Sequence, residues 1–418
     1  MNSCDAMLAY LKNRFDFLKG NLLVIVISSG FWNLAGQMVM PFFSLYVLGL
    51  GGSYIDIGVI SAIGSITRII PSLIGGYLAD SIGRKKIVYS MTFLMGINEL
   101  IKAFSPSVNF LFISAALGAI FGGIRGPAFE SITADSTKPD SRALAYAVLS
   151  VVPPLFGIVS PYVMGLLIDQ YGTVSAIRGG YLFVFFMYLV ATFLRYRYLE
   201  ETLALEEDVE KKSVRESVHE LFVDFKFTLR SLPKQLYVFM ILDLLLNLSW
   251  SIMSPYMIVY GTETIGLSSA QWGSIITFMT VTNLFVRPIA ASASDKYGRL
   301  KFIRPMLLLY PIIMYAFINS RNYMDVLIIR VLFAIIMSID SPAFQALMVD
   351  YSPKMHRGRF SAVMGIFRPL IWSAGNIIGG GLYQQYSTES PFHVGIICLL
   401  FSATLTLIFL KEPEIREE

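Results

Sequence analysis

Charged residues, cysteine and histidine are all scarce in this chain. Only 15% of its 418 residues are charged while 55% are hydrophobic, a balance that excludes an ordinary soluble enzyme. The two cysteines, Cys4 and Cys398, lie far apart in sequence, so we expect neither a disulfide nor thiol chemistry. The three histidines, His219, His356 and His393, lie in or near predicted loops, which leaves no imidazole relay and no histidine metal site.

Apolar stretches long enough to cross a bilayer account for most of the length. A spanning helix takes about 20 apolar residues, and the chain divides into about twelve such stretches. No P-loop pattern is present, so direct use of ATP is not indicated. We therefore predict an all-α integral membrane protein that is not an enzyme and needs no cofactor or metal. The predicted spans are 21–49, 54–80, 86–104, 108–135, 142–168, 179–199, 234–260, 268–294, 301–319, 323–350, 357–384 and 391–411.

One polar stretch divides the predicted spans into two sets. It follows the sixth span, and its second part places apolar residues at helical spacing, as does the start of the chain. Both patterns predict amphipathic helices on the membrane surface. The predicted organisation is a helix in 1–20, a first bundle in 21–199, a linker with a helix in 200–233, a second bundle in 234–411 and a tail in 412–418.

The basic residues are distributed unevenly between the two sides of the predicted membrane. Most of the 33 Lys and Arg fall in the two terminal segments, the linker and the connections on the same side. This positive-inside bias predicts that both termini are cytoplasmic and that the chain lies in the plasma membrane. A basic surface for nucleic acid is the weaker interpretation. We also expect the first apolar stretch to stay in the membrane, because it is too long for a cleaved signal segment.

An internal repeat links the two sets of spans. At an offset of 215 residues, PAFESITAD beginning at Pro127 aligns with PAFQALMVD beginning at Pro342. The alignment continues without a gap, so that Arg142 falls on Arg357. An even number of spans in each half keeps the same topology. The repeat therefore predicts two parallel six-helix bundles, related by a pseudo-twofold axis along the membrane normal, with a central cavity between them.

A loop motif after the second span gives the chain a family resemblance. The pattern G-x-x-x-D-x-x-G-R-K-x runs from Gly76 to Lys86 and returns in weaker form after the eighth span, where Ala291 replaces the glycine. With these two copies the sequence resembles the major facilitator superfamily along nearly its whole length, within the branch of drug or metabolite:proton antiporters. The resemblance implies that fold, transport by alternating access and, we expect, a monomer.

In the family, the loop motif latches the two bundles in one conformation. Carried over by position, Asp80 faces the start of the eleventh span near Arg357 and Arg359, and Arg84 meets Asp135. By pseudo-symmetry Asp295 faces Arg142, and Arg299 lies near Asp350. Plain topogenic charge is the alternative interpretation. The predicted latch residues are Gly76, Asp80, Gly83, Arg84, Asp135, Arg142, Asp295, Gly298, Arg299, Asp350, Arg357 and Arg359.

Two further family motifs are incomplete. The arginine expected near the outer end of the fourth span is Ala115 here, while the second half has Arg330, which weakens the family's usual proton-coupling role for span 4. The antiporter pattern on the fifth span is reduced to Ser160, Pro161 and Gly165. Small residues at this spacing are typical of close helix packing, which we favour over a coupling device.

Ionisable residues within the spans are the main functional candidates, because each costs several kcal/mol in the bilayer. Arg125 and Asp340 occupy equivalent positions of the two repeats, so we expect both to approach the centre with opposite charge. In the functional hypothesis Asp340 or Glu130 exchanges a proton while Arg125 binds an anionic group of the solute; a structural ion pair is the alternative. Arg68 and Arg368 also lie near mid-depth, and Asp243 is a further proton-coupling candidate.

Polar and aromatic side chains surround these charges and suit a solute of mixed polarity. Each of them has the alternative role of a helix contact or an interface anchor. The predicted substrate-binding set is Arg125, Asp340, Arg68, Arg368, Asn33, Gln37, Asn247, Trp250, Tyr256, Trp372 and Asn376.

Three classes of function are consistent with this sequence. The leading hypothesis is proton antiport that exports drugs or metabolites, with a small solute and protons as partners. The excess of arginine over carboxylate at mid-depth supports a second class, proton-coupled symport or uniport of an organic anion. A non-transporting receptor on the same scaffold is the third, but it gives no reason for the buried charge.

Overall fold

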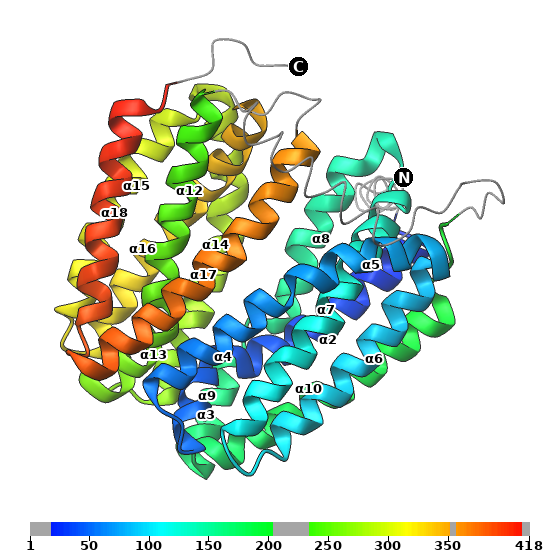
Figure 1. Cartoon of the computed structure of the whole chain (residues 1–418), viewed down its shortest axis with the longest axis horizontal. Helices are drawn as coiled ribbons and strands as arrows, with labels where there is room; N and C mark the ends of the chain where they lie inside the picture. The colour runs from blue at the N-terminus through cyan, green and yellow to red at the C-terminus, as the bar shows by residue number, and fades with distance from the viewer. Residues whose placement is uncertain (1–17, 204–233, 352–356, 412–418) are drawn as a thin grey trace, which may run out of the picture.

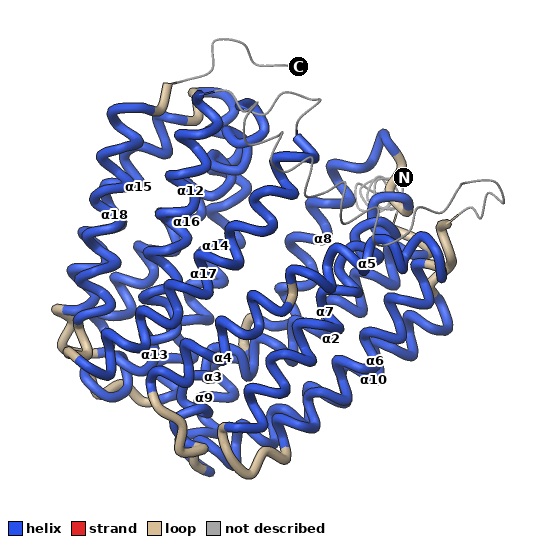
Figure 2. Tube along the Cα trace, in the orientation of Figure 1, coloured by secondary structure: helices blue, strands red, loops and turns tan. Residues whose placement is uncertain are grey.

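The computed structural model of the chain describes residues 18–203, 234–351 and 357–411, and this part is helical throughout apart from its connecting turns (Figure 2). Most of the predicted surface helices in 1–20 and 200–233, and the tail 412–418, lie outside the described residues. Among the described helices, eleven spans are long and apolar enough to cross a membrane. α6 (Arg84–Ala103) is the remaining one of twelve, and its charged residues make it less apolar than the others.

The first half consists of six spans, three of which are interrupted. Each interruption is a turn or a short 3₁₀ segment, and the spans begin and end within a few residues of the predicted positions. The helices are α2 (Asn21–Val39), η1 (Met40–Phe42), α3 (Phe43–Gly49), α4 (Tyr54–Thr67), α5 (Ile69–Ile82), α6, α7 (Asn109–Asp135), η2 (Pro139–Ser141), α8 (Arg142–Gly157), α9 (Ser160–Tyr171) and α10 (Thr173–Tyr198).

The second half repeats this order, with its first span interrupted and the others continuous. The helices are α12 (Lys234–Met253), η3 (Ser254–Tyr256), α13 (Met257–Val259), η4 (Tyr260–Thr264), α14 (Ser269–Tyr297), α15 (Leu300–Ile318), α16 (Tyr323–Tyr351), α17 (Arg357–Gln385) and α18 (Ser390–Phe409).

Backbone details recur at the offset of 215 residues found in the sequence. Gly51 and Gly266 have φ values of 81° and 80°, and Gly83 and Gly298 have φ values of 106° and 99°. These are left-handed conformations that glycine adopts without steric cost. Ser53 and Ser268 each begin a helix with a capping box. The two halves are therefore structural repeats down to the conformation of single turns.

Proline explains several of the interruptions. Pro41 and Pro255 lie in the 3₁₀ segments that break the first span of each half, because proline donates no backbone hydrogen bond. The two breaks meet, since the Ser44 hydroxyl donates to the Pro255 carbonyl oxygen at 2.7 Å. The second span of each half differs: in the first half the helix breaks at Arg68, ahead of Pro71, whereas α14 continues through Pro288.

The two halves form separate groups of helices that touch at one end and diverge at the other (Figure 1). α4 packs along α17, and α9 packs along α14. These contacts lie at the end of the molecule remote from the chain termini, which we call the opposite face. The end at which the described chain begins at residue 18 and ends at residue 411 is the terminal face. The molecule is therefore joined at the opposite face and open toward the terminal face.

Candidate functional site

The joint at the opposite face depends on helices in close contact. A Cβ atom added to Gly165 would lie 2.3 Å from the Ser269 carbonyl oxygen, and one added to Gly380 would lie 2.8 Å from that of Tyr54. Larger side chains do not fit at either place without separating the helices. The small residues of the incomplete fifth-span pattern, and their counterparts in α17, therefore hold the two halves together, in agreement with the packing interpretation.

A pair of helix caps crosses the same joint. The Asp169 carboxylate of α9 accepts hydrogen bonds from the backbone N–H groups of Ser269 and Ala270, at 2.9 and 3.0 Å, at the start of α14. At the equivalent position of the other half, the Gln384 side-chain oxygen of α17 accepts from the backbone N–H of Ile55 at 3.1 Å. Asp169 and Gln384, and Ile55 and Ala270, are each separated by the repeat offset. One cap is charged and the other is neutral.

A cavity of about 560 Å³ lies between the two halves. It is bordered by α8 and α14, in the portions of these helices that run to the terminal face. Gln37 contributes from the first half, and Arg287 and Asn283 contribute from the second. This cavity is the central one that the repeat predicts. Of the predicted substrate-binding set, Gln37 is the member that borders it.

Asp340 lies inside the second half, beneath a group of three aromatic rings. It is 7% exposed, and one of its oxygens accepts a hydrogen bond from the Tyr310 hydroxyl at 3.1 Å. The other oxygen has no hydrogen-bond partner among the described residues. The Trp250 ring packs edge-on against Tyr310 and lies 5.0 Å from Phe333, centroid to centroid. Asp340 is thus a buried carboxylate with no described cation paired to it.

Asp243 and Arg368 pair with each other. The guanidinium of Arg368 on α17 donates to both carboxylate oxygens of Asp243 on α12, at 2.7 and 2.8 Å. Asn247 donates to the same carboxylate at 3.2 Å. Sequence reasoning assigned Asp243 to proton coupling and Arg368 to solute binding. In this structure each group has the other as its partner.

We expect Asp243→Asn to lower the melting temperature of the purified protein, because the change leaves the Arg368 guanidinium without its carboxylate. Losing one partner of such a contact costs about 1–3 kcal/mol. Thermal unfolding in detergent measures the effect. The double variant Asp243→Asn/Arg368→Gln, neutral on both sides, should recover much of the loss. A single variant as stable as the wild type would show that the pair does not hold α12 to α17.

The first half contains a group of arginines that have no carboxylate partner among the described residues. Arg125 lies 5.7 Å from the centroid of the Phe129 ring, and Arg195 lies 5.0 Å from the same ring. Arg195 is 2% exposed and donates to the hydroxyls of Ser28 and Thr92. Arg195 was not among the predicted site residues.

Arg125 and Asp340 are not brought together. Arg125 lies beside the Phe129 ring in the first half, Asp340 contacts Tyr310 in the second, and no ion pair among the described residues joins them. The Glu130 and Arg68 side chains are exposed. The remaining proposed residues have varied surroundings: Asn33 donates to the Ser29 carbonyl, Trp372 is half-buried and Asn376 is fully buried. The Tyr256 hydroxyl lies within hydrogen-bond distance of the Tyr54 carbonyl oxygen across the joint and of the Asn376 carbonyl oxygen in its own half.

The predicted latch pairs form within each half. Arg84 contacts Asp135 and lies 3.3 Å from Asp80, and Arg299 contacts Asp350. Asp80 is largely exposed, with 64% of its side chain accessible. Gly83 and Gly298 make the turns before these arginines, Gly76 lies beside Pro127, and the Arg142 side chain is exposed. The side chains of Asp295, Arg357 and Arg359, which the predicted contact between halves requires, lie outside the described part of the chain.

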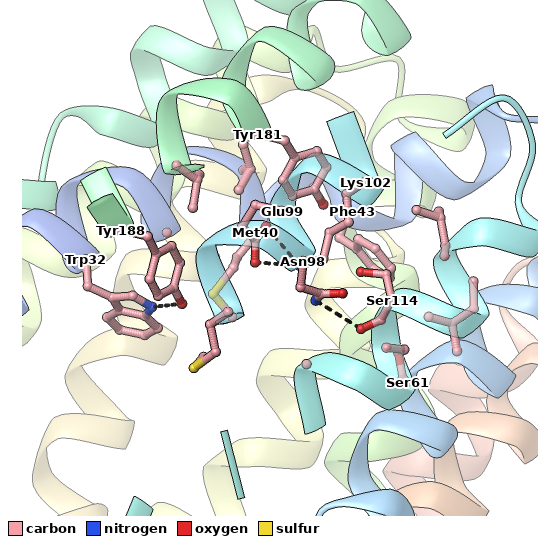
Figure 3. A pocket seen from close by; sticks show the side chains of 18 residues that line it. Trp32, Met40, Phe43, Ser61, Asn98, Glu99, Lys102, Ser114, Tyr181 and Tyr188 are labelled. Atoms are coloured by element: carbon pink, nitrogen blue, oxygen red, sulfur yellow. Dashed lines mark hydrogen bonds and ion pairs between the residues drawn. The ribbon is translucent and has the colours of Figure 1, made fainter. Parts of the chain in front are cut away.

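Sequence reasoning missed a second cavity, which lies within the first half (Figure 3). It encloses about 400 Å³ and contains Glu99, whose carboxylate is bound by Lys102 at 2.9 Å. Neither Glu99 nor Lys102 was among the predicted site residues. Their spacing of three residues on one helix was the signal available, because residues so spaced are neighbours on a helix surface.

These features define a class of membrane protein: two repeated bundles of six spans, joined at one face, with a cavity between them toward the other. The chain belongs to the Major Facilitator Superfamily, whose model matches residues 23–281 and 239–418. It is accordingly a transporter in a multi-pass membrane arrangement, and not an enzyme.

Relatives and solved structures agree with this assignment. The multidrug resistance protein MdtG of Escherichia coli is 24% identical over 410 residues, which cover 96% of each chain. The multidrug resistance efflux pump PmrA of Streptococcus pneumoniae is 23% identical and covers 93% of this chain and 96% of its own. The crystal structure of the human organic anion transporter MFSD10 superposes with a TM-score of 0.65 at 17% identity, covering 92% of this chain and 98% of that one. The last likeness concerns the fold alone.

Proposed function

We propose that this chain is a proton-coupled antiporter that exports drugs or metabolites across the plasma membrane by alternating access. Its relatives MdtG and PmrA are both named for multidrug resistance, and this supports the choice of export. The positive-inside bias makes the terminal face cytoplasmic. In that orientation the described conformation is open to the cytoplasm, which is the side from which an exporter loads its solute.

The observation that carries proton coupling is the unpaired, buried carboxylate of Asp340. An isolated charge at bilayer depth costs several kcal/mol, and protonation removes that cost. Protonation and deprotonation of Asp340 therefore change its interaction with the Tyr310 hydroxyl and with the aromatic group to which Tyr310 belongs. A free-energy change of several kcal/mol at a buried site is sufficient to shift the equilibrium between two conformations of the protein.

Proton flux in liposomes tests the proposal. The purified protein is reconstituted with an internal pH dye, and organic anions, sugars, amphipathic amines and neutral drugs are added under an imposed proton gradient. Antiport predicts that protons move opposite to at least one solute. Protons that move with the solute would contradict antiport and support symport. Solute movement that leaves the internal pH unchanged would contradict proton coupling altogether.

Proton-coupled symport or uniport of an organic anion is the second candidate. It is favoured by Arg125, Arg68 and Arg195, since none of these three has a described carboxylate paired with it. In this case the arginines of the first half bind a carboxylate or phosphate group of the solute.

For this candidate, Arg125→Gln should lower the affinity for an anionic solute by about tenfold while a neutral solute of the same shape binds as before. The reason is that a charge-assisted hydrogen bond is worth about 1.5–3 kcal/mol. Equilibrium binding of such a pair of solutes to the purified variant is the measurement. Equal losses for both solutes would indicate damage to the bundle and would count against an anion site.

A further inference from the structure

The cavity within the first half has the form of a binding site (Figure 3). It encloses about 400 Å³ between α2, α4, α6, α7 and α10. Trp32, Phe43, Tyr181 and Tyr188 supply aromatic walls, and aliphatic side chains and methionines make up half of the remaining lining residues. Met40, which is 62% exposed, marks its open side. A mostly apolar cavity of this size with a few polar groups suits a small organic molecule.

Glu99 and Lys102 provide the charged end of this cavity. Glu99 is 7% exposed, and both of its oxygens accept hydrogen bonds from the Lys102 ammonium at 2.9 Å. The same ammonium lies 5.2 Å from the centroid of the Tyr181 ring. The site therefore already holds a primary ammonium between a carboxylate and an aromatic face, an arrangement that binds organic cations.

Asn98 and Ser114, two of the residues that border the cavity, are hydrogen-bonded to each other. The Asn98 amide donates to the Ser114 carbonyl oxygen at 3.1 Å, but its own oxygen and the Ser114 hydroxyl are buried without a hydrogen-bond partner among the described residues. Asn98 is 2% exposed.

We propose that this cavity binds an amphipathic organic amine, whose ammonium group replaces that of Lys102 on the Glu99 carboxylate and whose aromatic body packs between Trp32 and the tyrosine rings. The inference deepens the proposed transport function, on which it rests, by naming the chemical class of the solute.

The geometry favours an amine over an anion. Glu99 is the deeper of the two charged groups, and the Lys102 side chain is more than twice as exposed, at 22% against 9%. Lysine has a flexible stem, so its ammonium is displaced toward the open side more readily than the glutamate. An anion would have to bind Lys102 beside the Glu99 carboxylate, which repels it. This cavity therefore favours a cationic solute, whereas the mid-depth arginines favour an anionic one.

A series of three probes with one aromatic body tests the inference: 1-naphthylmethylamine, 1-naphthylmethanol and 1-naphthylacetate. Binding to the purified full-length protein is measured by titration calorimetry at constant pH and salt. We expect the amine to bind at least about tenfold more tightly than the alcohol, because a buried charge pair contributes about 1.4 kcal/mol or more. The anion should bind most weakly. Equal affinities for amine and alcohol would overturn the inference.

Glu99→Gln should remove the preference for the amine and leave the affinity for the alcohol nearly unchanged. Lys102→Met, which keeps the stem but removes the competing ammonium, should raise the affinity for the amine several-fold. The double variant Glu99→Gln/Lys102→Met is neutral at both positions and is included in case a single change misfolds the bundle. It should bind the amine and the alcohol with equal affinity. Asp325→Asn is the matched control. Asp325 is a carboxylate at the start of α16 that does not border this cavity. Amine preference retained in Glu99→Gln or in the double variant would assign binding to another site.

This experiment separates the inference from the proposed transport function, because it measures binding without a membrane gradient. Amine binding that depends on Glu99, in a protein that moves no solute in liposomes, would uphold the site and overturn antiport. Antiport of other solutes, combined with amine binding that is indifferent to Glu99, would uphold antiport and overturn the site.

Discussion

Asp340→Asn is expected to abolish proton-coupled transport while solute binding persists. Asparagine has nearly the shape of aspartate and keeps an acceptor for the Tyr310 hydroxyl, so the packing of the aromatic rings above it should be retained. It cannot exchange a proton, and the coupling step is lost. We expect proton flux in liposomes to fall by at least about a hundredfold, which corresponds to about 2.7 kcal/mol.

Tyr310→Phe is the matched control for this prediction. It removes the hydrogen bond to Asp340 but keeps the ring that packs against Trp250 and Phe333, together with the exchangeable carboxylate. Its proton flux should be reduced but measurable. Unchanged flux in Asp340→Asn would remove this residue from the coupling mechanism, and loss of solute binding in the same variant would indicate a role in recognition.

Asp169→Ala is expected to release the joint at the opposite face. The carboxylate accepts two backbone N–H groups at the positive end of α14, an interaction that typically contributes about 1–2 kcal/mol. Its loss should raise the population of molecules that are open at the opposite face by about tenfold. Spin labels on Asn109→Cys and Arg321→Cys, one at this face of each half, measure the change as a longer distance, with Cys4 and Cys398 replaced by serine.

The pseudo-symmetric variant Gln384→Ala provides the comparison. It removes a single, uncharged hydrogen bond to the Ile55 N–H, so its effect on the same distance should be several-fold smaller than that of Asp169→Ala. High salt should narrow the difference between the two variants, because it screens the charged cap of α14. If both variants keep the wild-type distance, the helix contacts at Gly165 and Gly380 are sufficient to hold the joint.

The fold was predictable because its signals are long and repeated. Each span is set by the thickness of the bilayer, and the offset of 215 residues determines that the halves are parallel. The contact of Arg84 with Asp135 was implied by the family resemblance, and the repeat extended it to Arg299 and Asp350. α6 was predicted as a span too, although its charged residues lower its apolarity.

The candidate site was less predictable, because partners across helices depend on rotation as well as on depth. Arg125 and Asp340 occupy equivalent positions of the repeat, and yet each has its own surroundings. Arg195 was not singled out, since its position along a span does not reveal that it is buried against Ser28 and Thr92. Glu99 and Lys102 were also overlooked, because their pairing places both beside a cavity that only the arrangement of several helices creates.

The charge on α6 has a consequence for biogenesis. Its first turn carries Arg84, Lys85 and Lys86, and its last turns carry Glu99 and Lys102, so lipid alone is a poor environment for it. The Glu99–Lys102 ion pair and the packing of α6 against α7 and α10 give these polar groups the partners that lipid lacks. Stable integration of this helix therefore has to wait until α10 has been synthesised. Nascent chains truncated before residue 173 should leave α6 extractable from the membrane, whereas chains that extend beyond residue 198 should retain it.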